Sequence, residues 1–256
     1  MSTPFRRLSL LTGNETIKAL EQSRVLIAGL GGVGSWAAEA LVRSGIGGIS
    51  LLDFDTVCVT NINRQVQATS KTIGRLKTET LEERLKEINP LCEIKSFPFF
   101  FSKETENHFD ISGVDFVIDA IDSLQSKLDL IEAALNSGIR LFSSMGMAKK
   151  LDPTLIKTTD IWKTSGCPLA TLVRQGLRKR NCQKHFTVVY SPESPPGEAP
   201  PPKEAPLPAS EEPVIQQSGK RPIGSAVVVT ATAGMILASL VIREIHARTT
   251  GAAAHE

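Results

Sequence analysis

Residues 24–55 read RVLIAGLGGVGSWAAEALVRSGIGGISLLDFD, and this stretch decides the fold. Its periodicity predicts an apolar strand over 25–28, a glycine turn over 29–34, a helix over 35–44 and a second strand over 49–52. Two carboxylates, those of Asp53 and Asp55, follow the second strand. In such a unit the glycines permit a tight turn and a close approach to phosphate, and an acidic residue is placed to hold ribose hydroxyls. The stretch therefore predicts a nucleotide site at the N-terminus of the helix.

The composition is that of an ordinary globular protein. The chain has 256 residues, of which 41% are hydrophobic and 22% charged, so it can bury a sizeable core. Its formal charge of +2 is too small to attract polyanions as a whole, so any contact with nucleic acid must be a local basic patch. The four cysteines, Cys58, Cys92, Cys167 and Cys182, form no C-x-x-C pair and give no support to a zinc site of four thiolates. With no secretory signal pattern, we expect a reducing cytoplasm.

Further strands and helices alternate along the chain. Helices are predicted over 15–22 with Asn14 as N-cap, over 75–89, over 124–136 and from Pro168 onward, and strands over 92–97, 114–119, 139–144, 155–161 and 185–190. This alternation predicts an α/β fold: a Rossmann-like, doubly wound, mostly parallel sheet with helices on both faces. The expected units are an N-terminal arm and helix (1–23), the nucleotide-binding domain (24–190), a flexible Pro-rich insertion (191–222) and a smaller C-terminal part that packs back on the core (223–256).

Two segments near the C-terminus differ in composition from the rest. Residues 191–222 hold ten of the 15 prolines, which predicts the flexible insertion. Residues 226–242 carry no charge but are shorter than the roughly 20 residues that span a bilayer. We expect a buried strand–turn–helix there and no stable membrane span, with a membrane contact as the alternative.

Cationic and amide side chains follow the nucleotide-binding unit. By default a G-x-G-x-x-G turn indicates a dinucleotide such as NAD. Hydride transfer needs no extra cations beside that turn, whereas cleavage of a triphosphate does, because charge builds on the phosphate oxygens. The cationic and amide side chains that follow the nucleotide-binding unit are Asn61, Asn63, Arg64 and Lys77. Asp122, at a later strand end, is suited to hold Mg²⁺. Alone, each charged residue has an ordinary explanation as a solvated charge or a helix cap; together they favour ATP.

Several motifs occur in the order found in one enzyme superfamily. They are GLGGVGS, LLDFD, TNINRQ, the G-x-x-K of Gly74 to Lys77, Asn89-Pro90 and VIDAIDS. Over about residues 5–145 the chain therefore resembles the adenylating domain of the ubiquitin-activating-like enzymes (ThiF/MoeB/HesA). The resemblance implies adenylation of a carboxylate with ATP and Mg²⁺ by an enzyme that works as a homodimer.

The same resemblance implies roles for individual residues. The glycine loop, with Gly32 under the phosphates, and Asp53, on the ribose, would hold the nucleotide. Asp122 would meet Mg²⁺ and, with Ser123, the acyl phosphate, while Arg7 would reach the site of a partner subunit. The implied nucleotide-binding set is Gly29, Gly31, Gly32, Gly34, Asp53, Asn61, Asn63, Arg64, Lys77, Asp122 and Ser123, and the implied catalytic set is Arg64, Lys77, Asp122 and Arg7.

Further segments resemble one branch of the superfamily, the tRNA threonylcarbamoyladenosine dehydratases. These are GGVGSWAAEALVRSGIG, VCVTNINRQ, DPT at 152–154, CPLA at 167–170, VVYS at 188–191 and GSAVVVTATAGM at 224–235. This resemblance implies that the threonyl carboxylate of the modified adenosine beside the anticodon is adenylated. The carbamoyl nitrogen of the substrate would then close a ring and release AMP.

Other functions remain open at this point. The runner-up is an adenylyltransferase for a ubiquitin-like sulfur carrier, although the zinc cysteine pairs of MoeB- and ThiF-like proteins are absent. A NAD-dependent oxidoreductase would rest on the glycine turn alone, and a non-catalytic nucleotide-binding scaffold is the last alternative. A sulfur-acceptor protein is left open as a further partner. Cys167 and Cys182 are expected to be small buried side chains rather than nucleophiles.

A tRNA substrate needs a basic contact surface. The candidates are Arg174, Arg178, Lys179, Arg180 and Lys184, on and after the predicted basic helix. A solvated helix face is the alternative, and the sequence alone favours neither.

Overall fold

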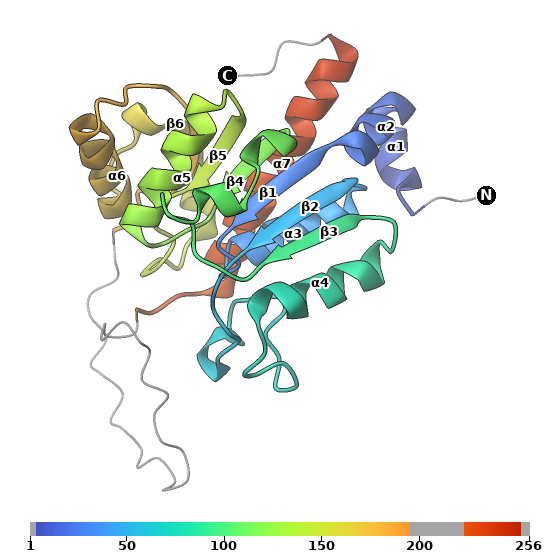
Figure 1. Ribbon diagram of the computed structural model, residues 1–256, viewed down its shortest axis with the longest axis horizontal. Helices are drawn as coiled ribbons and strands as arrows, with labels where there is room; N and C mark the ends of the chain where they lie inside the picture. Colours follow the sequence, from blue (N-terminus) through green and yellow to red (C-terminus); the bar gives the residue numbers. More distant parts are fainter. Residues whose placement is uncertain (1–3, 195–222, 252–256) are drawn as a thin grey trace, which may run out of the picture.

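The computed structural model describes residues 4–194 and 223–251. Its centre is a seven-stranded sheet in the order β3-β2-β1-β4-β5-β7-β6 (Figure 1). The strands are β1 (Arg24–Ala28), β2 (Gly48–Leu52), β3 (Glu93–Phe97), β4 (Phe116–Asp119), β5 (Arg140–Ser144), β6 (Lys157–Asp160) and β7 (Thr187–Tyr190). All neighbouring pairs are parallel except β6 and β7, which are antiparallel. The predicted α/β class with a mostly parallel sheet is confirmed.

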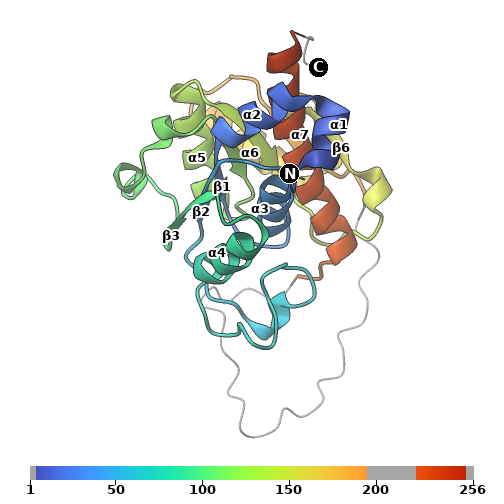
Figure 2. The same ribbon diagram turned by 90° about the vertical axis from the view of Figure 1, so that its right-hand side faces the viewer.

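Helices cover both faces of this sheet, as Figures 1 and 2 show. On one face α3, α4 and α7 pack against the strands, and on the other α5 and α6 do so. The bounds are α1 (Arg6–Thr12), α2 (Asn14–Gln22), α3 (Gly34–Arg43), α4 (Lys77–Ile88), α5 (Leu124–Asn136), α6 (Pro168–Lys179) and α7 (Val227–Thr250). Single 3₁₀ turns lie at η1 (Val59–Asn61), η2 (Glu106–His108), η3 (Ile111–Gly113), η4 (Pro153–Leu155) and η5 (Ile161–Lys163).

The strand β1 shows why an uninterrupted apolar run forms the centre of the sheet. Val25 and Ile27 belong to the hydrophobic cluster under α3 and α7, whereas Leu26 and Ala28 belong to the cluster under α5 and α6. Successive side chains of a strand point to opposite faces, so a strand buried on both faces must be apolar at every position.

The prediction of a strand–turn–helix over 226–242 is wrong, because the segment is part of the single helix α7. The β-branched run at its start favours a strand by local propensity, but tertiary packing overrides that preference. Gly234 provides the close contact: a Cβ at this position would collide with Val33 O and would lie 2.9 Å from Trp36 Cβ on α3. The missing side chain therefore lets α7 lie directly on the start of α3.

Among the described residues, α7 is also the helix that is long and apolar enough to cross a bilayer. Its buried side chains, which include Leu237, Val241 and Ile245, lie in the core cluster with α3 and the sheet. Length and composition alone are therefore weak evidence for a membrane span.

The N-terminal arm holds two helices, α1 and α2, rather than the single predicted helix. The N-cap of α2 is Gly13, whose φ of +84° turns the chain between the helices, so the prediction of Asn14 as N-cap is wrong. The predicted Pro-rich insertion lies, from residue 195 to residue 222, outside the described residues.

The strand order changes direction between β1 and β4, because β2 and β3 lie on one side of β1 and the later strands lie on the other. In open α/β sheets ligands bind beyond the carboxyl ends of the strands at this switch point. The glycine turn follows β1 there, and the loop 120–123 follows β4.

Candidate active site

The glycine turn is tightly enclosed by backbone on one side. Gly29 has a φ of +88°, and a Cβ on it would lie 2.6 Å from Ala120 O in the loop after β4. A Cβ on Gly34 would collide with Gly29 O. Around Gly31, by contrast, a Cβ would meet nothing within 4 Å, so this part of the turn is open. Glycines thus bring the loops after β1 and β4 together and leave room beside the turn for a ligand.

Gly32 meets protein atoms that the sequence does not reveal. A Cβ there would lie 2.9 Å from Thr230 Oγ1 on α7 and 3.1 Å from Arg64 Cγ. The need for glycine at this position therefore comes at least partly from α7, whereas its place under phosphates stays a prediction.

The first turn of α3 has the character of an anion site. Backbone N–H groups in the first turn of a helix lack intrahelical acceptors and carry a partial positive charge. The N-cap residue, Val33, makes no side-chain capping hydrogen bond to them. The open side of the glycine turn at Gly31 therefore leads to donors suited to phosphate oxygens.

Asp53 fixes the glycine turn to the end of β2. Its Oδ2 accepts a hydrogen bond from Leu30 N at 2.6 Å, and its Oδ1 accepts one from Asp55 N at 2.9 Å. Burial raises the pKa of the Asp53 carboxyl, while attraction from Lys77 and these hydrogen bonds act in the opposite direction. The carboxylate thus lies directly beside the turn.

Lys77, the first residue of α4, places its ammonium between two carboxylates. Its Nζ donates to Asp55 Oδ2 at 2.6 Å and lies 3.9 Å from Asp53 Oδ1. The lysine side chain is only 7% exposed, but that of Asp55 is 47% exposed. A buried cation therefore faces a partner that is open to solvent.

Arg64 lies on the loop between β2 and α4. Its guanidinium donates to Thr60 O at 2.8 Å and to Asn63 Oδ1 at 3.0 Å, and its own carbonyl accepts a hydrogen bond from Trp36 Nε1. Burial lowers the pKa of Arg64, and the negative charge of Asp122 partly counters this shift. The charges of Arg64 and Asp122 thus lie close enough to attract each other.

The two asparagines of this loop support it. Asn61 is buried and accepts a hydrogen bond from Cys58 N at 3.0 Å. Asn63 donates from Nδ2 to Ser225 O at 2.9 Å, just before α7, and accepts from Arg64 with its other amide atom. In this structure both asparagines contact protein, and Asn63 orients Arg64.

Asp122 and Ser123 are exposed in the loop after β4. A buried group under this loop, which sequence reasoning missed, holds it in place. Asp119 accepts hydrogen bonds from Ile121 N at 3.1 Å, from Lys127 Nζ at 2.7 Å and from Ser143 Oγ at 2.5 Å. The signal was present as a second aspartate in VIDAIDS, three residues before Asp122.

A cavity of about 440 Å³, lined in part by Phe54 and Ser123, was also missed. Its aromatic walls are Phe54 and Phe100, whose rings meet edge to face with centroids 5.9 Å apart. The remaining lining residues are Ser102, Lys103, Glu104, Ser123, Gln125, Ser126 and Asp129. Phe54 follows Asp53 directly in the sequence, but the lining residues from Phe100 onward reach the cavity only through the fold.

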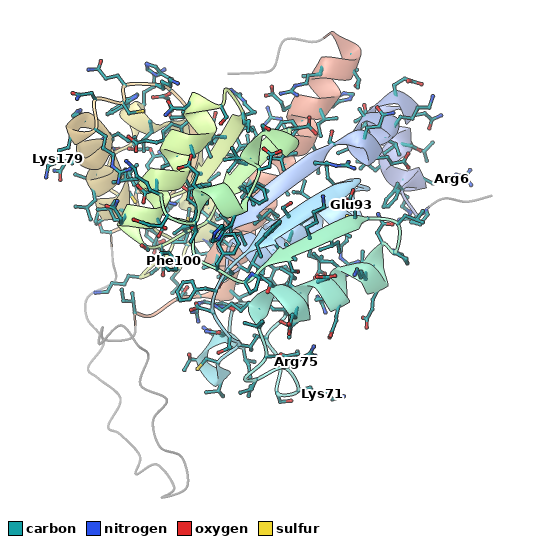
Figure 3. The ribbon with its side chains drawn as sticks, in the orientation of Figure 1. Arg6, Lys71, Arg75, Glu93, Phe100 and Lys179 are labelled. Carbon is teal, nitrogen blue, oxygen red and sulfur yellow. The ribbon has the colours of Figure 1, made fainter. Side chains whose placement is uncertain are left out.

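The structure does not bring Arg7 to these residues. Arg7 is exposed on α1, and Phe5, two residues earlier, lies 3.1 Å from where a Cβ on Gly45 would be, just after the C-terminal end of α3. The glycine turn lies at the opposite end of α3. Figure 3 shows the neighbouring Arg6 at one edge of the molecule, while Phe100 lies near the carboxyl ends of the strands.

A model of the ThiF family matches residues 5–255. The chain belongs to the ThiF family. Within it, the tRNA threonylcarbamoyladenosine dehydratase of Bacillus subtilis is 44% identical over 191 residues, which cover 75% of each protein. The protein of the same name from Haemophilus influenzae is 41% identical over 189 residues, or 72% of each.

Solved structures of the ThiF-family protein TcdA agree over almost the whole chain. A crystal structure of Escherichia coli tRNA N6-threonylcarbamoyladenosine dehydratase, TcdA, in complex with ATP has a TM-score of 0.83 and 32% identity. The match covers 98% of this chain and 96% of that one. The resemblance to the superfamily and to its dehydratase branch is thus confirmed.

Proposed function

We propose that this chain is an ATP-dependent enzyme that adenylates the threonyl carboxylate of tRNA threonylcarbamoyladenosine and closes it to a ring. One agreement carries the proposal: Arg64 and Lys77 follow β2 and Asp122 follows β4, the two strands on either side of β1, and relatives along most of the chain are named dehydratases of this nucleoside. The TcdA structures in complex with ATP and with AMP support the nucleotide.

The proposed nucleotide position follows from the strand ends. The phosphates lie at the first turn of α3, where free N–H groups and the helix dipole favour anions. Asp53 holds the ribose. The base enters the adjoining cavity, because the rings of Phe54 and Phe100 offer apolar faces against which a purine packs.

Adenylation forms a bond between a carboxylate oxygen and the α-phosphorus and breaks the bond to pyrophosphate. Negative charge grows on the departing phosphates, and the cations Lys77 and Arg64 stabilise it. A carbamoyl nitrogen then attacks the acyl carbon and loses its proton, and AMP departs. The nucleoside loses one water in total, while ATP becomes AMP and pyrophosphate.

Magnesium fits the side chains at this site. Within residues 4–194 and 223–251, no three His, Cys, Asp or Glu side chains gather into a metal cluster. Mg²⁺ is usually held by one or two carboxylates together with substrate phosphates, so it needs no such cluster. The exposed Asp122 carboxylate would hold the ion, which would neutralise phosphate charge.

A homodimer in the cytoplasm completes the proposal. Arg7 lies toward the far end of α3 from its own glycine turn, so a role at an active site requires a second copy. The four cysteines are free thiols, which suits a reducing compartment.

The exchange of labelled pyrophosphate into ATP tests this function. We expect exchange with tRNA that carries threonylcarbamoyladenosine and none with tRNA that lacks the carboxylate. Arg64→Ala should lower the rate by about 10²–10³, as the loss of one donor to a developing oxyanion does. Arg75→Ala is the matched control, because Arg75 lies on the surface, paired with Glu83. Exchange stimulated by a small protein ending in Gly-Gly, and not by tRNA, would contradict the proposal and favour the sulfur-carrier alternative.

A further inference from the structure

One segment of the chain is strongly basic. Residues 161–185 hold six of the 29 Lys and Arg residues and none of the 27 Asp and Glu residues. Since the whole chain has a formal charge of +2, the remaining 23 basic and 27 acidic residues leave the rest at −4. Positive charge is thus concentrated on η5, α6 and the loop that follows, which is the local patch that a polyanion needs.

Three of these six cations are held by neighbouring protein groups. Arg180 forms ion pairs with Asp129 at 2.8 Å and Glu132 at 2.6 Å on α5. Arg174 donates to the carbonyl and hydroxyl of Thr164, and Lys184 donates to Leu135 O and Asn136 Oδ1 at the end of α5. Their first role is to fix α6 and its loop to the domain.

The other three cations are exposed, and one of them lies over an aromatic ring. Lys163, Arg178 and Lys179 are exposed, and Figure 3 shows Lys179 at the edge of the molecule opposite Arg6. The guanidinium carbon of Arg178 lies 5.3 Å from the centre of the Trp162 ring. Trp162 is half-buried, and its Nε1 donates to Lys184 O at 3.2 Å, which fixes the orientation of the ring.

Resting on the proposed function, we propose that the surface formed by Trp162, Lys163, Arg178 and Lys179, here called the η5–α6 surface, binds the tRNA substrate. The three cations contact phosphates, and Trp162 with the guanidinium of Arg178 forms a flat platform for an unpaired base. Single-stranded RNA is recognised in this way, by cations along the backbone and by bases stacked on aromatic rings or Arg planes.

The charge contribution is measured with a fluorescein-labelled anticodon stem-loop that carries threonylcarbamoyladenosine, without ATP and over a series of NaCl concentrations. The triple variant Lys163→Gln, Arg178→Gln, Lys179→Gln should reduce the steepness of log K against log salt by about 2 to 3, since each phosphate contact contributes about 0.7–0.9. The triple variant Lys18→Gln, Lys86→Gln, Lys95→Gln removes the same charge from other exposed lysines and should keep the slope.

The stacking contribution is measured with the same stem-loop. Trp162→Ala should weaken binding by about five- to hundredfold, and Trp162→Phe, which keeps a ring, should restore most of it. ATP binding, followed by calorimetry, should stay unchanged in all variants and so reports an intact fold.

If the wild type cyclises the nucleoside but both triple variants share its slope and its KM for tRNA, the η5–α6 surface is not the RNA site. If the wild type neither binds nor cyclises the modified tRNA, the proposed function itself fails.

Discussion

Lys77 and Lys127 are two buried lysines in similar positions with different surroundings. Each lies at the beginning of a helix and donates to an aspartate at or just after the end of a strand, Lys77 to Asp55 at 2.6 Å and Lys127 to Asp119 at 2.7 Å. The Lys127–Asp119 pair is fully enclosed, whereas the side chain of Asp55 is 47% exposed. The same residue types at the same distance thus form a closed pair and an open one.

The difference indicates two different uses of a buried lysine. In the closed pair the aspartate also accepts from Ser143 and from Ile121 N, so the ammonium has no freedom to change partner. A closed pair of this kind positions the loop that carries Asp122. In the open pair Lys77 can leave Asp55 for a phosphate, because water can solvate the released carboxylate. We therefore propose a structural role for Lys127 and a role in charge stabilisation for Lys77.

The largest expected effect is the loss of the closed pair. Lys127→Met leaves the Asp119 carboxylate buried without its cation, which should lower the free energy of unfolding by about 3–5 kcal/mol. Urea denaturation measures this change. Adding Asp119→Asn should recover part of the loss, because the second change removes the unpaired charge. A loss below about 1 kcal/mol for Lys127→Met would show that the pair does not hold the loop.

Breaking the open pair should affect rate more than stability. Lys77→Gln should lower pyrophosphate exchange by about 10²–10³, since one cation at the developing phosphate charge is lost. Its cost in unfolding free energy should be smaller than that of Lys127→Met, because the carboxylate of Asp55 is half-exposed and that of Asp53 keeps its hydrogen bonds from Leu30 N and Asp55 N. Full exchange combined with a loss of stability as large as that of Lys127→Met would reverse the two assignments.

The smallest expected effect is a shift in the pH at which Cys58, a cysteine influenced by the charge of Lys77, reacts with iodoacetamide. Hydrogen bonds from Thr60 lower the pKa of the Cys58 thiol, and the charge of Lys77 adds to this, whereas burial raises the pKa of Cys92 to about 11. Because the thiolate is the reactive form, iodoacetamide should label Cys58 at a lower pH than Cys92. In Lys77→Gln the labelling of Cys58 should shift toward higher pH, as followed by peptide mass spectrometry. Equal pH profiles for Cys58 in both proteins would place Lys77 too far away to act on this part of the site.

The sequence predicted the central features because they are local. The glycine turn, Asp53 and the alternation of strands and helices are patterns within short windows, and parallel strands necessarily carry their ends to one edge of the sheet. On this basis the sequence predicts that Arg64, Lys77 and Asp122 belong to one site.

What the sequence could not predict depends on contacts between distant segments. The helix α7 begins with Val227, Val228 and Val229, which favour a strand locally, and only packing on α3 through Gly234 makes the helix the better solution. The bond from Ser143 to Asp119 and the meeting of Phe54 with Phe100 likewise join residues far apart in the chain. The ion pairs of Arg180 with α5, which separate structural cations from free ones, have the same origin.

Mass spectrometry of the modified nucleoside tests the proposed reaction most directly. The wild type is incubated with ATP, Mg²⁺ and tRNA that carries threonylcarbamoyladenosine, and the tRNA is then digested to nucleosides. We expect the modified nucleoside to lose the mass of one water while AMP accumulates, and we expect neither change without ATP. An unchanged nucleoside in the presence of ATP, or conversion accompanied by ADP instead of AMP, would contradict adenylation followed by ring closure.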